Sequence, residues 1–410
     1  MAGSHAHGHG DIPDVEVARL PRFLLLTGLG LVAVATVVGL FVLWPEEADR
    51  PEPVQYAAEG VTWPRAEVVK VGEACPVVVA DPNAPPQEAP EFPEGCNELA
   101  ATLSEGAAEG QQVVVSVPPS VARSGLRPGD AVTLLEIPAE DGRPAAYGWV
   151  GIDRNLPLGL LTVAFVLIVA VVARLRGILA LLGLVIAGYV VAWFLLPALL
   201  AGEQGMAVAF VGSSAIMFVV LYLAHGPSIR TSAALAGTLV GIAITATIGW
   251  WAIRAARLSG ISEESGEQLL VNAEGIDYQG LLASAVIIAG LGVLNDVTIT
   301  QSSAVWELRA AAPELSRRSL FTSGMRIGRD HIASTIYTIV FAYAGTALAV
   351  LMLLSLYDRS LLDTLTDESI REEIARTLAS AIGLVLAVPV TTGIAAVTVS
   401  GPHQGPRQPA

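Results

Sequence analysis

The chain has 410 residues, of which 53% are hydrophobic and only 15% are charged, and its mean hydropathy is +0.59. This composition is that of an integral membrane protein. The formal net charge of −15 argues against nucleic acid as a partner.

Long apolar runs recur along the chain. A run of about 20 apolar residues is the length that crosses the hydrocarbon core of a bilayer. The sequence therefore predicts an α-helical polytopic bundle of about eight transmembrane helices. The expected spans are Phe23–Trp44, Pro157–Ala173, Ile178–Leu200, Met206–Ala224, Ala233–Ile253, Leu281–Ala304, Ile332–Leu356 and Thr377–Val399.

The first run, residues 23–44, is expected to be a signal anchor. Arg19 and Arg22 come just before it, and Pro45 and Glu46 follow it in place of a small-residue cleavage site. Residues 1–22 are then a cytoplasmic tail, and the anchor stays in the membrane.

Arginines in the short loops predict the orientation. The loops that fall on the same side as the N-terminus carry most of them, and arginine-rich short loops stay in the cytoplasm. The residues concerned are Arg174, Arg176, Arg230, Arg309, Arg317, Arg318, Arg326 and Arg329. We therefore expect a multi-pass protein of the bacterial plasma membrane with both termini cytoplasmic, a seven-helix bundle over residues 156–400 and a disordered tail over residues 401–410.

Residues 45–155 are expected to form a small extracytoplasmic domain rich in β-structure. Short β-branched runs are separated there by Pro, Gly and Asp, which is typical of strands and turns in a β-sandwich or a small barrel. The runs are Val68–Val71, Val77–Ala80, Val113–Val117 and Val132–Ile137.

The only two cysteines, Cys75 and Cys96, both lie in this exported segment. Because disulfides form outside the cytoplasm, we expect a Cys75–Cys96 bond, worth about 3 kcal/mol in the chain-entropy model. The alternative is two free thiols or a cysteine-ligated metal, although the other ligands of a zinc site are lacking.

Two polar helices give the chain a family resemblance. The string GLGVLNDVTITQSSAVWEL over residues 290–308 and SGMRIGRDHIASTIYTIVFAYAG over residues 323–345 resemble the signature helices of the YibE/F family of bacterial membrane proteins. The resemblance implies an N-terminal anchor, an exported domain and a multi-span bundle, with no established substrate and transport as a suggested role. Tyr337, Thr298 and Thr300 depart from the expected family pattern.

Asp296 is the most informative residue, because it lies inside the expected span 281–304. A charged side chain at the bilayer centre costs roughly 2.5–3.5 kcal/mol on insertion scales and usually marks a pathway or a partner. At helical spacing, Thr300, Ser303 and Glu307 share its face, and Asn295 flanks it. At about 1.5 Å per residue from Leu281, Asp296 is expected in the cytoplasmic half of the membrane.

Asp330 is expected near the cytoplasmic start of the next span, beside Arg326, Arg329 and His331. If the two spans pack antiparallel, Asp330 and Asp296 reach a comparable depth and form a cytoplasm-proximal cation or proton site. The two arginines equally permit an anionic substrate, held by charge-assisted hydrogen bonds.

A purely structural interpretation competes with this site. Arg326 and Asp330 are four residues apart and could form an intrahelical ion pair, while Asp296 bonds to Asn or Ser neighbours. Likewise, Gly237 and Gly241 form a small-residue face that suits either close helix packing or self-association into a homo-oligomer.

No enzyme signature is present, since the chain lacks a phosphate-binding loop, a His-Glu-x-x-His pair and a nucleophile elbow. We expect no cofactor, and no metal ligands are assigned. The most consistent function is a secondary transporter or ion permease for a small ion or small molecule, using Asp296 and Asp330. The alternative is a membrane scaffold or sensor whose exported domain binds a protein partner.

Overall fold

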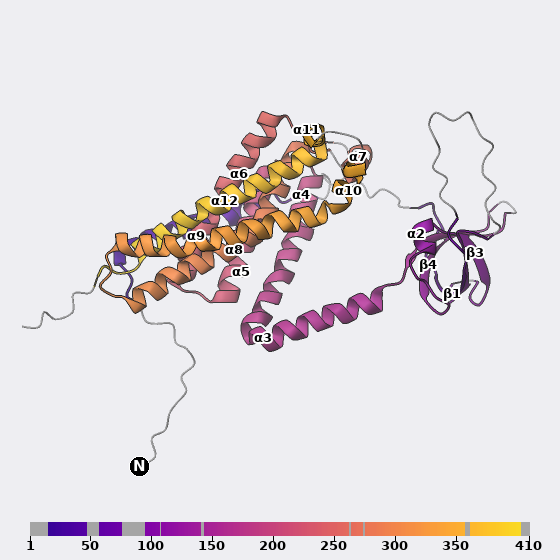
Figure 1. The fold of residues 1–410 in the computed structure, drawn as a ribbon, viewed down its shortest axis with the longest axis horizontal. Helices are drawn as coiled ribbons and strands as arrows, with labels where there is room; N and C mark the ends of the chain where they lie inside the picture. Colours follow the sequence, from indigo (N-terminus) through magenta and orange to yellow (C-terminus); the bar gives the residue numbers. More distant parts are fainter. Residues whose placement is uncertain are drawn as a thin grey trace, which may run out of the picture. The chain divides into compact units, whose positions relative to one another are not determined.

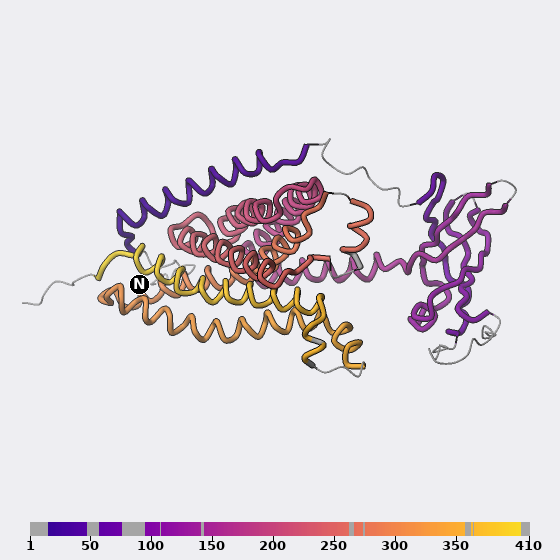
Figure 2. The backbone as a smooth tube through the Cα atoms, turned by 90° about the horizontal axis from the view of Figure 1, so that it is seen from above, coloured from indigo at the N-terminus to yellow at the C-terminus, as the bar shows by residue number. Residues whose placement is uncertain are grey.

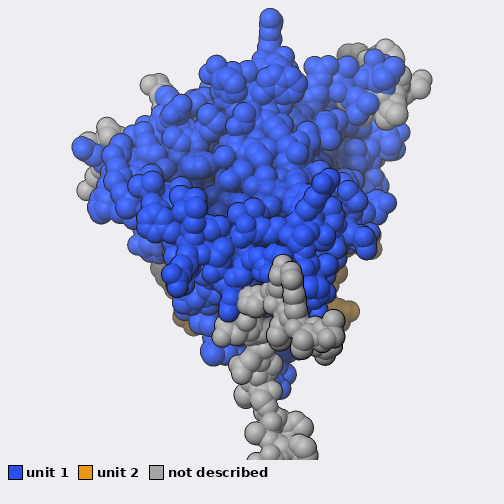
Figure 3. All heavy atoms as spheres, turned by 90° about the vertical axis from the view of Figure 1, so that its left-hand side faces the viewer, with its two compact units in different colours: residues 1–52, 169–410 blue, residues 53–168 orange. Residues whose placement is uncertain are grey.

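The computed structural model describes residues 15–46, 57–75, 95–106, 108–140, 143–261, 264–273, 275–356 and 361–402 (Figure 1). The chain forms two compact units, one of residues 53–168 and one of residues 1–52 with 169–410 (Figure 3). The first unit holds a small β-sheet, and the second is a helical bundle.

The sheet unit is a five-stranded antiparallel sheet in the order β3-β2-β1-β4-β5, and β3 also contacts β5. Because β3 at one edge of the sheet also contacts β5 at the other edge, the sheet closes on itself, so the small barrel is the observed form. The predicted run Val77–Ala80 lies outside the described residues. The elements are β1 (Arg65–Val71), β2 (Glu98–Leu103), β3 (Gln112–Ser116), α2 (Pro119–Ala122), β4 (Ala131–Ile137) and β5 (Ala146–Ile152).

The barrel core follows from the period of two in its strands. In β3, Val113 and Val115 are buried while their neighbours are exposed, and β2 buries Leu99, Ala101 and Leu103 in the same way. Alternate side chains of a strand point to opposite faces, so these strands turn one apolar face inward.

Cys75 and Cys96 form the predicted disulfide, with their Cα atoms 5.0 Å apart. The side-chain oxygen of Asn97 accepts a hydrogen bond from the Cys75 backbone N–H, at 3.0 Å, which fixes the approach of the two segments. Gly72 lies directly against the Gly95 carbonyl, where no side chain would fit. The disulfide therefore closes a junction that is already tightly packed.

We predict that the native protein contains no reactive thiol before reduction, because both cysteines are used in this bond. Thiol titration of the purified, denatured protein measures this directly. Replacing both cysteines with Ser should lower the stability of the barrel by about 3 kcal/mol. Two titratable thiols without reductant would contradict the expectation.

Long helices make up the second unit, and side-chain caps fix where several of them begin. The side chains of Ser228, Asp277, Ser316 and Asp367 each accept a backbone N–H of the helix that follows. The helices are α1 (Arg19–Val42), α3 (Asn155–Val190), η2 (Val191–Leu195), α4 (Leu196–Leu200), α5 (Gly205–His225), α6 (Ile229–Ala256), α7 (Glu264–Asn272), α8 (Tyr278–Ala311), α9 (Arg317–Thr346), α10 (Leu348–Leu356), α11 (Leu361–Thr364) and α12 (Glu368–Thr398).

Among the described residues, 6 helices are long and apolar enough to cross a membrane, or up to 7 if the bent pair α9 and α10 counts as one span. The expectation of about eight treated residues 157–173 and 178–200 as separate spans. In the structure these residues belong to one helical stretch, interrupted by a non-helical Arg174 (φ 53°, ψ −137°). The count therefore depends on how this stretch meets the membrane.

Glycines allow α12 to pack closely against α6, α8 and α9 (Figure 2). Gly237 of α6 lies against Thr391, and Gly241 lies against Leu294 and Ala387. A small residue lets two helix backbones approach each other. The face formed by Gly237 and Gly241 is thus occupied within the chain, which favours packing over self-association at this face.

The N-terminal part of α1 meets the end of α12. The Ala18 N–H donates to Thr398 O at 3.0 Å, and the Ser400 N–H donates to Glu16 O at 2.8 Å. Arg317, at the start of α9, donates to Val399 O at 3.4 Å. These three helix ends therefore share one end of the bundle, which we call the terminal end.

Candidate functional site

Asp296 lies on α8 with its side chain 68% exposed, and its Oδ2 is 3.8 Å from Nε2 of His331 on α9. This pair links the two helices that carry the polar signature. Two of the predicted site residues are thereby brought together, and the carboxylate stays open on its other side.

Two buried polar atoms beside Asp296 make no hydrogen bond to any described residue. They are Oδ1 of Asn295 and Nε2 of His331. Buried polar atoms are nearly always hydrogen-bonded, so an unsatisfied one points to a ligand, an ion or water. The surroundings of Asp296 thus have unused hydrogen-bonding capacity.

The polar residues of α8 divide between two faces. The predicted stripe is open, since Asp296, Thr300 and Glu307 are exposed and Ser303 is half-buried. The buried polar residues are bonded across the bundle: Thr298 to Thr238 at 2.6 Å, Gln301 to Gly324 O at 2.7 Å and Ser302 to Arg230 O at 2.8 Å. Helix packing therefore explains the buried polar residues of α8, but it does not explain the exposed stripe that contains Asp296.

Sequence reasoning missed the role of Gln301, which is 2% exposed and holds α9 against α8. The available signal was its angular position on the helix. Gln301 lies on the side of α8 away from Asp296, where a polar residue must find a partner inside the bundle.

The charged residues Arg326, Arg329 and Asp330 of α9 are exposed. The buried face of α9 contains Gly324 and Gly328, so the charges lie away from the helices that α9 packs against. Within the described ranges, no ion pair joins Asp330 to either arginine. The alternative of an intrahelical pair between Arg326 and Asp330 is therefore not the arrangement observed.

The depth of these residues follows from their neighbours on α12. Gly328 packs against Val388, which lies near the middle of the apolar run at residues 378–399. At about 1.5 Å of rise per residue, Val388 is about 17 Å from Val399, roughly half of a hydrocarbon core about 30 Å thick. Asp330 therefore lies level with the middle of the apolar run of α12, next to His331, which contacts Asp296.

This level within the bundle follows from the early start of α9. Ser316 caps the helix at residue 317, and the segment before Ile332 continues alongside α8 and α12 instead of forming a loop. The five charged or ionisable residues Asp296, Arg326, Arg329, Asp330 and His331 form what we call the mid-depth cluster. Among the residues described, no group of three or more metal-ligating acidic, His or Cys side chains is found, there or elsewhere.

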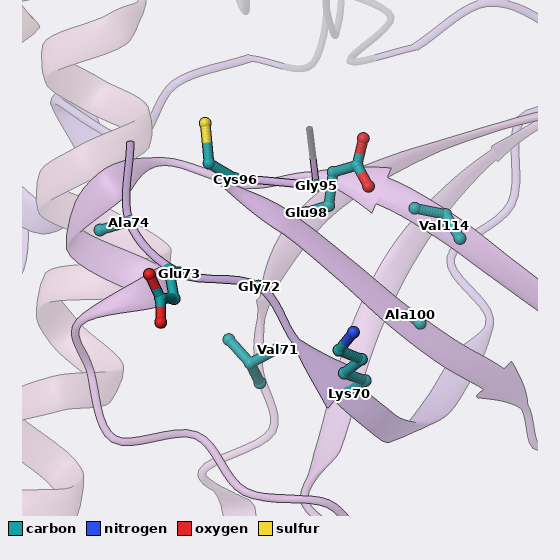
Figure 4. Close-up of a pocket in the computed structure, with 10 residues that line it drawn as sticks. All are labelled: Lys70, Val71, Gly72, Glu73, Ala74, Gly95, Cys96, Glu98, Ala100 and Val114. Atoms are coloured by element: carbon teal, nitrogen blue, oxygen red, sulfur yellow. The ribbon is translucent and has the colours of Figure 1, made fainter. Parts of the chain in front are cut away.

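A separate pocket of ≈ 740 Å³ lies on the barrel, beside the disulfide. Figure 4 shows Lys70 of β1, Glu98 of β2 and Val114 of β3 around it. Two side chains of opposite charge and an apolar one could together bind a polar ligand.

A bundle of apolar helices, several of them long enough to cross a bilayer, defines the class as a multi-pass membrane protein. A family model described as YibE/F-like protein matches residues 161–401, so the chain belongs to the YibE/F-like family. The match contains all of α8 and α9 and excludes the barrel. No curated protein and no solved structure matches the chain.

Proposed function

We propose that the protein is a secondary transporter or ion permease in which Asp296 and His331 bind the transported or coupling ion. The observation that supports this most is an open carboxylate beside a histidine whose Nε2 lacks a hydrogen bond, and we propose that both lie near mid-depth in the membrane. Ionisable residues at such a depth form proton relays and ion pathways in many membrane proteins.

The chemistry of the pair favours a cation or a proton as the ligand. A carboxylate attracts positive charge, and an imidazole gains or loses a proton near neutral pH. Asp296 and His331 lie 3.8 Å apart, close enough for one ion or one water to contact both. Arg326 and Arg329 are turned away from the buried face of α9 and so do not compete for Asp296.

The proposed topology has about eight spans, with Arg174 separating two of them. Gly177 packs tightly against Val169 and Ala173, as expected where two helices turn back on each other. Eight crossings return the chain to the side where it began, in keeping with the shared position of α1 and the end of α12. The arginines Arg230, Arg317 and Arg318 support a cytoplasmic position for the terminal end.

This topology predicts the labelling of single cysteines introduced in place of Arg318 and Glu203. The Arg318 position should resist a membrane-impermeant thiol reagent in intact cells, whereas the Glu203 position should react. The native cysteines are bonded to each other and contribute no background. Labelling of Arg318→Cys from outside would contradict the proposed orientation.

Transport itself is tested with the full chain in liposomes that contain a pH-sensitive dye or a dye selective for the imposed cation. Protons and the common monovalent and divalent cations are imposed as gradients one at a time, with protein-free liposomes as the control. We expect at least one gradient to drive flux well above the control. If none does, the proposed transport of a cation or a proton is contradicted.

Ligand binding by the exported barrel is the second candidate function, favoured by the pocket beside the disulfide. Replacing Lys70 and Glu98 with Ala separates the two functions. If the protein is a transporter, these changes leave ion flux intact. If it is a sensor, the wild type shows no flux, and the same changes abolish the response to the extracytoplasmic ligand.

A further inference from the structure

We infer that the mid-depth cluster is completed by a second copy of this chain, which packs on the exposed side of α9. Arg326 of each copy would pair with Asp330 of the other. This inference does not depend on which ion is transported.

The first observation is the position of the charges on α9. A helix turns about 100° per residue, so Arg326, Arg329 and Asp330 fall within an arc of about 100°. All three are exposed, and the arc lies opposite the face that packs on α8 and α12. This arc therefore forms part of the outer surface of the bundle.

The second observation is the depth of the arc. Gly328, between these residues, packs against Val388 near the middle of the apolar run of α12. Two arginines and a carboxylate at this depth cannot face lipid without a large cost, and within the described residues none of them has an ion-pair partner. Another surface must cover them.

The charges on this arc indicate which surface covers it. The arc carries both signs, Arg326 and Asp330, four residues apart on one helix. A two-fold axis along the membrane normal keeps both copies in the same orientation and sets the two α9 helices parallel, so Arg326 of each copy can reach the partner's Asp330 one helical turn away. The hydrocarbon of the lipid would satisfy neither sign.

The geometry is tested by oxidative cross-linking in native membranes. Ala333 is exposed and lies on the same arc one turn further along, so Ala333→Cys should give a disulfide-linked dimer. Val240→Cys is the matched control, because Val240 is exposed on α6 next to Gly241, which packs against Ala387 as Gly328 of α9 packs against Val388. A monomer only, or equal cross-linking of the control, would overturn the inference.

The pairing is tested by charge reversal in two tagged copies. Arg326→Asp alone and Asp330→Arg alone should each weaken self-association about tenfold or more, since like charges then meet at both contacts. Co-expression of the two variants should restore a mixed dimer, because each Asp again meets an Arg. An intrahelical pair cannot be restored by mixing copies.

Co-purification of the two tags gives the readout. If both variants fold and the mixed pair does not form, a second copy does not pair through these residues and the inference is wrong. If neither variant folds, the Ala333→Cys cross-link decides the question alone. A wild type that stays monomeric in lipid nanodiscs while the Ala333→Cys thiol reacts with a lipid-soluble maleimide would assign the face to lipid and reject the inference.

Discussion

Replacing Asp296 with Asn is expected to abolish ion flux and to leave the melting temperature of the purified protein almost unchanged. Asn keeps the size and hydrogen-bonding capacity of the side chain but removes the charge that we propose binds a cation. The side chain is 68% exposed, and its ion-pair partner is His331 at 3.8 Å, so little packing is lost. The measurement is flux into dye-loaded liposomes, alongside thermal unfolding of both proteins.

The matched control is Glu307→Gln, which removes an exposed carboxylate from the same stripe of α8. Glu307 lies near the end of α8, away from His331, and its loss should leave most of the flux. Equal loss in both variants would point to the net charge of the helix instead of a site. A strongly destabilised Asp296→Asn variant with normal flux would establish a structural role.

Replacing Gly328 with Leu is expected to separate α9 from α8 and to destabilise the bundle by about 1–3 kcal/mol or more. A Cβ atom at Gly328 would lie 2.6 Å from Val388 and 3.0 Å from the Gln301 side chain, and both are inside the bundle. The helix must shift, so His331 moves away from Asp296. Flux should therefore fall together with the melting temperature.

Gly345→Leu is the control for this change, because Gly345 lies on the same helix with nothing within 4 Å of its added Cβ. It should retain both the flux and the melting temperature of the wild type. Should Gly328→Leu behave like this control, the packing of α9 on α8 and α12 would be wrong.

The apolar runs predicted most of the membrane helices, because hydrophobicity and length alone decide whether a segment can span a bilayer. Hydrophobicity and length do not decide the number of spans in the broken helical stretch around Arg174. Residues 157–173 and 178–200 each satisfy the criterion for a span, yet the structure continues the helix on both sides of one non-helical residue. Local composition cannot distinguish a short loop from a sharp break.

The disulfide and the barrel strands were accessible to sequence reasoning for a different reason. With only Cys75 and Cys96 in the chain, one pairing exists, and alternation predicts strands directly. The closure of β3 on β5 depends on contacts between distant strands, so the choice between sandwich and barrel remained open.

For the candidate site, helical spacing predicted that Asp296 and Thr300 share one face of α8, and in the structure this face is exposed. Helical spacing could not give the register between helices, which sets Gly328 against Val388 and brings Asp330 level with the middle of the apolar run of α12. Helical spacing also could not predict that His331 is the partner of Asp296. The two residues come together because Gly324 and Gly328 of α9 pack against the neighbouring helices.

The account rests on ions and water reaching Asp296 near mid-depth, and the reactivity of a cysteine at this position tests that most directly. In Asp296→Cys the introduced thiol is the only free one, because the native pair is bonded. We predict rapid reaction with a small, charged methanethiosulfonate reagent in membranes, while Val240→Cys at a similar depth stays unreactive. An inert thiol at residue 296 would contradict the proposed ion pathway.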